Sequence, residues 1–446
     1  MVWGICLDKG IDIPLYQQLS DAVIRLIGDG TLKADTKLPP IRQMAQVLGV
    51  NNTTVVSAYK DLEQKAAVYS VVGSGTYVAW PMRVGEPPVQ ALPVIDDEYI
   101  NFAHTATEAA LFPVAAFKRA FNAVMDRDGA AAFGYHDSQG YEALRESACL
   151  LLGGLGVGVC PDVHIISGAK QGLEMLASAL LEPGDTVFVE GPASHEAVLS
   201  AGRAKVIEMP MAKDGPDFIG LEVLLKRHRP KLFYVVPAFF QPAGMCYSAE
   251  SKRRLLEIAS AYDAYIVEED QLSDFYYDGI KRPPLQALDN GGRVIYIKNF
   301  SRILTPGVGI GFMACPSGMP EIRSADTPPP GYAQRAFDIF IRSGGFEAHA
   351  ANMRRVYGRR YQKLVAAAHT YLAPIADFEL PGGGLSLWVT PHHKTADYAD
   401  KFLQRKVVVS PGQLFAAENG FRISFAAVPE ERIAEGIGVI ASVLRA

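Results

Sequence analysis

The sequence predicts an α/β protein with a smaller, mainly helical domain at its front. From Tyr99 onward, apolar runs of strand length alternate with amphipathic helical patterns, as in a mostly parallel sheet covered by helices on both faces. Before residue 80, three short helical patterns and two short apolar strands stand apart from that alternation. We therefore expect two domains of different fold.

Length and composition agree with this organisation. The 446 residues are enough for two or three domains with sizeable cores, and the net charge of −5 is ordinary. The five cysteines form no CxxC pair, so neither a disulfide framework nor a zinc site is expected. The first residues do not have the pattern of a signal peptide, and no apolar stretch is long enough to cross a bilayer. A cytoplasmic protein without a bound metal is expected.

The first domain begins with two short helices. Apolar residues at steps of three and four predict a first helix that ends near Gly28–Gly30. These residues are Leu15, Leu19, Val23, Leu26 and Ile27. A second helix is expected after Pro39-Pro40, and Gly49 should end it.

The third helix completes a helix-turn-helix pattern. Asn51 or Asn52 can cap it, and Val55, Val56, Tyr59 and Leu62 form its apolar face. In such a pair of helices the second can enter the major groove of DNA. Residues 68–72 and 76–79 then predict two strands of a hairpin around Gly73-Ser74-Gly75. This order predicts a DNA-binding winged helix.

Residues 14–78 resemble the GntR family of bacterial regulators. The resemblance depends on Leu38-Pro39, Arg42, Ala45, Gly49-Val50, Tyr59 and Gly73-Ser74-Gly75-Thr76 taken together. It implies a set of residues that face double-stranded operator DNA. With Asn52 as a base reader, that set is Arg42, Asn52, Thr53, Thr54, Ser57, Ser74, Gly75 and Thr76.

Two departures from the GntR pattern bear on DNA binding. Asn52 stands where the family usually has arginine, and Val71-Val72 stands where it has Arg-Pro. Residues 1–80 hold seven basic and seven acidic residues, so this segment has no net charge. Because phosphate contacts dominate affinity, weaker or altered DNA binding is expected. The alternative is a helix-turn-helix retained only as a structural module.

Behind this domain (residues 1–79), a linker is expected over 80–98 and a large domain over 99–446. The linker is rich in proline and has little periodicity. The large domain should divide into a large subdomain (about 99–325) and a smaller C-terminal α+β subdomain (about 326–446). Strands are expected at 163–167, 186–190, 205–209, 231–236, 265–269 and 294–297, and helices at 171–181 and 249–262.

Residues 100–446 resemble a fold-type I aminotransferase. The matching stretches are Gly134-Tyr135, Gly140-Tyr141, Leu144-Arg145, Gly168 with Gln171, 183–190, Pro237 with 241–244, 268–270, Phe300-Ser301 with Leu304 and Pro306-Gly307, and 421–425. Residues 349–360 are close to the pattern of one subgroup, the MocR-type regulators, which join a GntR winged helix to an aminotransferase-like domain. The resemblance implies a homodimer and pyridoxal 5'-phosphate as the family cofactor.

The residues that would hold this cofactor have changed. The lysine that forms the imine with the cofactor in the family is here Arg302, which stays protonated and cannot take that role. The phosphate-binding arginine falls at Gly309, the Asp-Asp-Tyr group at Glu269-Asp270-Gln271 and the asparagine at Gln241. The stacking aromatic would lie near Ser194 or His195. Covalent binding of pyridoxal phosphate is therefore not expected.

Part of the site remains recognisable. Arg422 matches the arginine that binds the substrate carboxylate in aminotransferases. The alternative interpretation is that Arg422 only packs between domains or lies on the surface. Lys298 and Lys170 are the only nearby amines that could replace the missing lysine. The expected degenerate pocket comprises Ala169, Lys170, Gln241, Glu269, Gln271, Ser301, Arg302 and Arg422. An ion pair of Glu269 with Arg302 could fill it, and His104, His136 and His195 have no motif around them.

Three functions follow as hypotheses. The first is a DNA-binding transcriptional regulator whose non-enzymatic large domain senses a small carboxylate or amino-acid-like effector. The second is an aminotransferase-like protein, vestigial or responsive to pyridoxal phosphate, which would have to use Lys298 or Lys170. The third is a scaffold that has lost both DNA and cofactor binding. The missing lysine weighs against the second, and the neutral winged helix is what favours the third.

Overall fold

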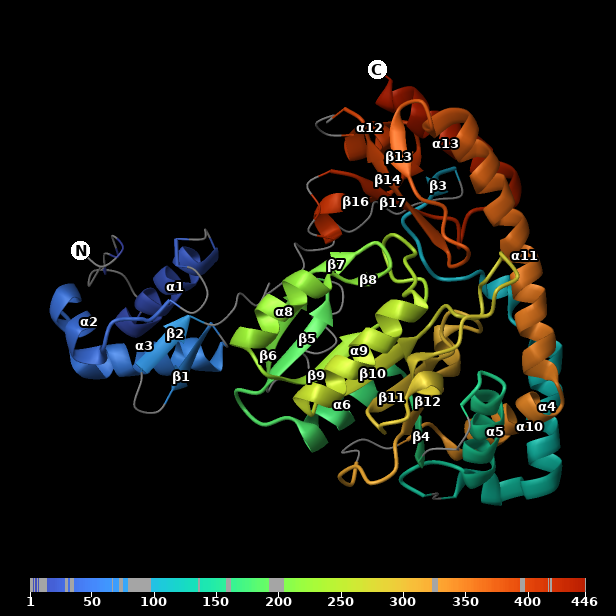
Figure 1. Cartoon of the computed structure of the whole chain (residues 1–446), viewed down its shortest axis with the longest axis horizontal. Coiled ribbons are helices and arrows are strands. Elements are labelled where there is room, and N and C mark those ends of the chain that lie inside the picture. The colour runs from blue at the N-terminus through green and yellow to red at the C-terminus, as the bar shows by residue number, and fades with distance from the viewer. Residues whose placement is uncertain are drawn as a thin grey trace. The chain divides into compact units, whose positions relative to one another are not determined.

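The computed structural model describes residues 3, 5, 7, 14–28, 31–32, 36–65, 67–71, 75–78, 98–134, 137–157, 162–191, 204–322, 328–393, 398–415, 417 and 419–445. It divides into two compact units, residues 1–94 and 95–446, which are described separately (Figure 1). The linker expected over 80–98 lies outside the described residues except for Glu98.

Three helices form the first unit: α1 (Leu15–Gly28), α2 (Ile41–Leu48) and α3 (Asn52–Gln64). Their apolar faces meet in one core. Gly49 ends α2 in a left-handed conformation (φ 63°), and its N–H donates to the carbonyl of Ala45. The side chain of Asn51 caps α3 by accepting from the Thr53 N–H at 3.3 Å. Of the two asparagines considered as a cap, Asn51 takes the role and Asn52 becomes the first residue of the helix.

The hairpin consists of β1 (Val68–Val71) and β2 (Gly75–Val78), which pair antiparallel from Val68 opposite Val78 to Val71 opposite Gly75. A third extended segment joins it, since the N–H of Leu38 donates to Thr76 at 2.8 Å and that of Val78 donates to Thr36 at 2.9 Å. The chain before α2 is thereby fixed to the wing. Ser74 and the rest of the loop tip lie outside the described residues.

A seven-stranded sheet organises the second unit, in the order β4-β12-β11-β10-β9-β5-β6. Its strands are β4 (Asp162–Ile166), β5 (Thr186–Glu190), β6 (Lys205–Met209), β9 (Pro230–Val235), β10 (Tyr265–Asp270), β11 (Val294–Asn299) and β12 (Gly311–Cys315). The six predicted strands are confirmed within two residues. The sheet is parallel except for β12, which runs antiparallel to both of its neighbours and which the sequence pattern did not separate.

Alternate residues of each strand face opposite layers of helices. Val187, Val189 and Ile295 pack against α6 (Ala169–Leu180) on one face. On the other face, Phe188 and Val294 pack with α8 (Phe218–Arg227) and α9 (Ala249–Tyr262). This two-sided burial explains why the strands read as continuous apolar runs. It also leaves the carboxyl ends of the parallel strands as the edge where polar side chains can gather.

The C-terminal part is built on a four-stranded sheet in the order β13-β14-β17-β16. Its strands are β13 (Ala376–Phe378), β14 (Ser386–Pro391), β16 (Ser410–Pro411) and β17 (Phe421–Ser424). The helices of this part and of the sheet edge are α4 (Val114–Asp128), α5 (Glu142–Gly153), α10 (Gly331–Arg342), α11 (Gly345–Ala367), α12 (Tyr398–Gln404) and α13 (Ile433–Leu444). The long α11 runs from beside α10 to α13 (Figure 1). Apolar residues of both sheets join in one core.

Three general expectations can be compared with the structure. Within the described ranges, no helix is long and apolar enough to span a membrane. Over the same ranges, no group of three or more His, Cys, Asp or Glu side chains could hold a metal ion. Cys246 and Cys315 are free thiols, whereas Cys149 is disulfide-bonded, a bond that the scattered cysteines of the sequence did not indicate.

Candidate DNA interface and ligand site

The residues expected to face DNA lie on one polar side of α3 and at the start of α2. Asn52, Thr53 and Ser57 are exposed and Thr54 is half-buried, while the opposite side of α3 is buried in the core. The side chain of Asn52 makes no hydrogen bond to the described residues. Because Asn51 supplies the cap, the Asn52 amide is left available for a base edge.

The orientation of α3 against α2 is held by Tyr59. Its hydroxyl donates to the carbonyl of Pro39 at 2.7 Å, directly before α2 begins. Burial raises the pKa of Tyr59 well above its ordinary value, so the hydroxyl remains a donor. Arg42 is exposed in the first turn of α2. On the wing, Gly75 is exposed and Thr76 half-buried.

The second group of candidate residues lies where β10 and β11 end. Glu269 and Asp270 are the last two residues of β10, and Lys298 lies opposite Asp270 on β11. All three are buried, and such buried charges are stable only when paired or hydrogen-bonded. Ser301 and Arg302 follow the end of β11. The structure thus brings Glu269, Gln271, Ser301 and Arg302 to one edge of the sheet, as expected from the sequence.

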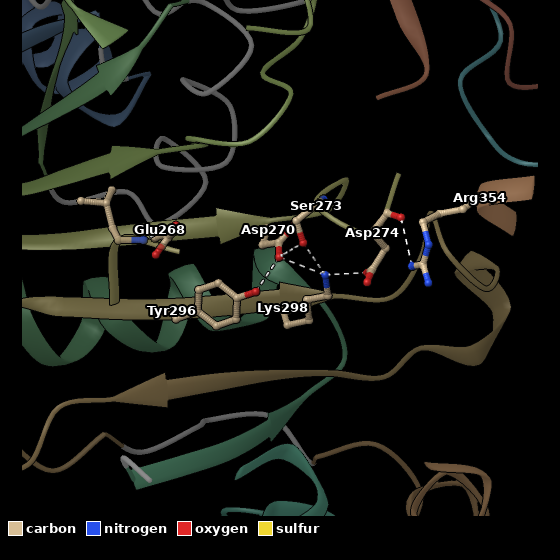
Figure 2. A network of polar contacts seen from close by, with 8 residues as sticks. Glu268, Asp270, Ser273, Asp274, Tyr296, Lys298 and Arg354 are labelled. Carbon is tan, nitrogen blue, oxygen red and sulfur yellow. Dashed lines mark hydrogen bonds and ion pairs between the residues drawn. The ribbon is translucent and has the colours of Figure 1, made fainter. Parts of the chain in front are cut away.

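Lys298 is engaged in a network of acidic and hydroxyl groups (Figure 2). Its ammonium lies 3.0 Å from Asp270 and 2.7 Å from Asp274, and it donates to the Ser273 hydroxyl at 3.1 Å. Tyr296 and Ser273 also donate to Asp270. Burial by itself would lower the pKa of Lys298, but the carboxylates of Asp270 and Asp274 outweigh it and raise the pKa well above the ordinary value. The Lys298 amine is therefore held as an ammonium.

Arg302 is half-buried, and only one of its five donors has a hydrogen-bond partner among the described residues: Nη1 donates to the Thr105 hydroxyl at 3.0 Å. Burial lowers the pKa of Arg302, and the nearby Glu269 carboxylate opposes that shift. The ion pair expected between Glu269 and Arg302 is not formed at contact distance. Glu269 instead accepts from the Tyr234 hydroxyl and the Gln271 amide, because both donors stand closer to it.

Arg422 lies on β17 and reaches toward the same edge. Its Nη2 donates to the Ser410 hydroxyl at 2.8 Å and to the carbonyl of Ala103 at 3.1 Å, and its Nη1 lies 3.4 Å from the Gln241 amide oxygen. Its Nε is buried and has no hydrogen-bond partner among the described residues. Burial and the neighbouring Arg302 cation lower the pKa of Arg422 to about 10. None of its partners is a carboxylate.

Other expected members of the pocket are less involved. Ala169 and Lys170 begin α6, where the Lys170 side chain is 73% exposed and lies 4.0 Å from Glu174. The backbone N–H of Ser301 donates to Asn299 at 3.0 Å. Gly309 offers no side chain and has a left-handed backbone (φ 56°). His104 is exposed, as expected for an ordinary histidine, whereas His136, Ser194 and His195 lie outside the described residues.

Several neighbours of the candidate site residues were missed from the sequence. Thr105 lies 197 positions before Arg302 in the chain, and Tyr234 lies on β9 beside β10. Asp274 had a usable signal, because it lies four residues after Asp270, where a turn can return it to the same lysine. Thr105 and Tyr234 carry no such local signal, since only the fold brings them to the site.

Comparison with known proteins agrees with this architecture. Residues 15–78 match the family described as bacterial regulatory proteins of the gntR family, and residues 98–440 match aminotransferase class I and II. A probable rhizopine catabolism regulatory protein MocR of Rhizobium meliloti is 31% identical over 86% of this chain and 83% of its own length. An HTH-type transcriptional regulator, YisV, of Bacillus subtilis is 26% identical over 97% of this chain and 96% of its own length.

Solved structures are similar to the second unit. A kynurenine aminotransferase from Pyrococcus horikoshii is 29% identical with a TM-score of 0.72, covering 78% of this chain and 91% of that one. A multiple substrate aminotransferase from Thermococcus profundus is 27% identical with a TM-score of 0.75, covering 82% and 96%. The chain therefore belongs to the MocR-type group of GntR-family transcriptional regulators, in which a DNA-binding winged helix precedes an aminotransferase-like domain.

Proposed function

We propose that this regulator binds operator DNA as a cytoplasmic homodimer and responds to a small carboxylate held noncovalently in its aminotransferase-like domain. In this proposal Arg42 and the wing residues Ser74, Gly75 and Thr76 contact phosphates. The exposed residues at the start of α3 read base edges. The large domain performs no catalysis. Its residues bind a ligand and transmit the binding to DNA affinity.

The proposal that the ligand binds noncovalently rests on the chemistry of two basic residues, Lys298 on β11 and Arg302 just after it. Arg302 is a guanidinium and cannot condense with an aldehyde. Lys298, the nearest amine, is held as an ammonium between Asp270 and Asp274. An amine must lose its proton before it can attack a carbonyl, so both groups argue against a covalent cofactor.

Three further residues do not fit pyridoxal phosphate. Gly309 cannot supply the phosphate-binding guanidinium. Gln271 donates to Glu269 and so is not free to act toward a ring hydroxyl. Lys170 points into solvent beside Glu174 rather than replacing the missing lysine. We therefore derive no chemical step through this cofactor, and the contacts of Lys298 and Lys170 weigh against the aminotransferase alternative that would use them.

Arg422 supports the choice of a carboxylate ligand. A guanidinium binds carboxylates through two parallel hydrogen bonds, and Arg422 has only neutral partners and one buried N–H without a partner. A ligand carboxylate would supply the missing negative charge. Any ligand that binds two dimer geometries with different affinity shifts the equilibrium between them.

The proposal is tested by two measurements on the full chain. Fluorescence anisotropy with DNA from the region upstream of its own gene should show saturable binding that an excess of unrelated DNA of equal length does not remove. Spectra and intact mass with and without added pyridoxal phosphate should show neither visible absorbance nor a covalent mass increase. Absence of DNA binding, or a stable adduct, would contradict the respective half of the proposal.

A further inference from the structure

Two arginines at the ligand site carry positive charge that the described protein groups do not pair. Arg302 follows β11 of the large sheet, and Arg422 belongs to β17 of the smaller sheet. Within the described ranges, neither has a carboxylate within ion-pair distance of 4.0 Å. The two guanidiniums contact the same short segment, Arg422 at the Ala103 carbonyl and Arg302 at the Thr105 hydroxyl. The Arg302 cation accordingly contributes to lowering the pKa of Arg422. Two like charges close together in a partly buried site repel each other, and a bound anion would offset that repulsion.

The unused donors of the two arginines are distinct. Arg302 has one contact, to Thr105, which leaves most of its fork available. Arg422 is oriented by Ser410, Ala103 and Gln241, and it stacks on the Phe415 ring with its Cζ 5.0 Å from the ring centre. The two forks are fixed by different elements and different partners. The two arginines therefore present separate donor groups, one after β11 and one on β17.

Glu269 does not occupy either position. Its two oxygens already accept from Tyr234 and Gln271, and burial raises its pKa above the ordinary value. Its effect on Arg302 is electrostatic and involves no hydrogen bond or ion pair at contact distance. The charge of the two arginines is consequently left for a ligand, and a single carboxylate on Arg422 would leave Arg302 without a partner.

We propose that the ligand is a small dicarboxylate whose two carboxylates are bound separately by Arg422 and Arg302. This inference rests on the proposed function and adds that Arg302, at the position of the missing lysine, is a specificity residue for the second carboxylate. A diacid bridges the large and small sheets through one arginine on each. Such a ligand can sense the relative position of the two sheets, since both contacts form only at one separation.

The test is a calorimetric titration of the full-length protein with malonate, succinate, glutarate and adipate, each paired with its monoamide. The monoamide keeps the length and one carboxylate but replaces the other by a neutral group. One diacid should bind at least tenfold more tightly than its monoamide, because a charge-assisted hydrogen bond is lost in the latter. Arg302→Gln should remove this preference and leave the diacid with the affinity of the monoamide. Arg355→Gln, an exposed arginine on α11, is the matched control and should keep the preference.

Several results would overturn the inference. Equal affinity for every diacid and its monoamide in the wild type would do so without the need for any variant. Persistence of the preference in Arg302→Gln, or displacement of the diacid by inorganic phosphate at equal concentration, would do so as well. The monoamides and diacids could bind with equal affinity, and Arg422→Gln could abolish the binding of both. That result would exclude a dicarboxylate ligand but would still agree with the proposed binding of one carboxylate by Arg422. Failure of DNA binding is a separate result, since it concerns the winged helix.

Discussion

At the scale of single residues, the chain has Arg302 where its resemblance to aminotransferases places the lysine that binds the cofactor. We expect that borohydride reduction in the presence of pyridoxal phosphate labels neither position 302 nor Lys298. The first has no amine, and the second is an ammonium between two carboxylates. Peptide mass mapping is the measurement. Arg302→Lys supplies the amine and is the positive control for reagent access. Labelling of Lys298 in the wild type would show that the buried network opens.

Arg42 is expected to contact a phosphate. Arg42→Ala should weaken binding to all DNA sequences by a similar factor and lower the salt slope by about one unit, because one fewer counterion is released. Binding measured at several salt concentrations checks this. Arg25→Ala, on the exposed side of α1, is the matched control. A slope equal to that of the wild type would remove Arg42 from the interface.

Asn52 is expected to read a base instead. Asn52→Ala should cost about 1–3 kcal/mol at one operator position and relax specificity there, while the salt slope stays constant. Asn51→Ala is the informative comparison, because it removes the helix cap and should lower the free energy of unfolding by roughly 1 kcal/mol. If Asn52→Ala binds every single-base operator variant like the wild type, the start of α3 does not face the bases.

At the scale of the elements, the end of β5 introduces a pH dependence of stability. Glu190 is fully buried, accepts from the Val236 N–H at 2.9 Å and from the Tyr247 hydroxyl, and burial raises its pKa to about 8. In the unfolded chain the pKa returns to about 4.3. Between these values the folded protein binds the proton more strongly, so the free energy of unfolding falls as pH rises from about 5 to 8.

Glu190→Gln should therefore flatten that decline, since glutamine keeps the shape and cannot ionise. Thermal midpoints between pH 5.5 and 8.5 should fall by less in the variant than in the wild type, with a difference on the order of several degrees. Part of the slope should remain, because burial also raises the pKa of Glu268 to about 7. Asp126→Asn, on an exposed carboxylate of α4, is the control. Identical slopes in variant and wild type would show that Glu190 does not titrate in this range.

The elements themselves were largely predictable. The strand-length apolar runs gave six of the seven strands because both faces of each strand are buried. α9 occupies the predicted residues 249–262 because Ser248 caps it and Asp263 ends it in a left-handed turn. β12 was missed because it is only five residues long, is buried at every position and has no α-helix between it and β11, so neither an alternating pattern nor a strand–helix–strand order sets it apart. The expected Glu269–Arg302 pair was wrong because Tyr234, invisible from local sequence, satisfies Glu269.

At the scale of the whole molecule, motif spacing predicted the identities of the site residues but not their partners. Arg302, Arg422 and Gln241 were found because family motifs place them at fixed offsets. Most of their partners come from segments more than 100 positions away, such as Thr105 beside Arg302 and Ala103 beside Arg422, although Ser410 lies only 12 positions before Arg422. Only the folded sheet edge brings such groups together. Sequence could therefore identify the residues of the candidate site, whereas the hydrogen-bond partners of its two arginines came only from the structure.

The last prediction joins the two domains. If a carboxylate ligand acts through Arg422, it changes DNA affinity only by binding one conformation of the regulator better than another. Arg422→Ala should then abolish the effect of the ligand on operator affinity, with the affinity of the ligand-free variant as the reference. Thermal-shift titration identifies the binding acid among amino, keto and dicarboxylic acids, and anisotropy with operator DNA measures the coupling. Reciprocity requires that operator DNA change the ligand affinity by the same factor. A ligand that stabilises Arg422→Ala as much as the wild type, or a coupling that differs between the two directions, would contradict this mechanism.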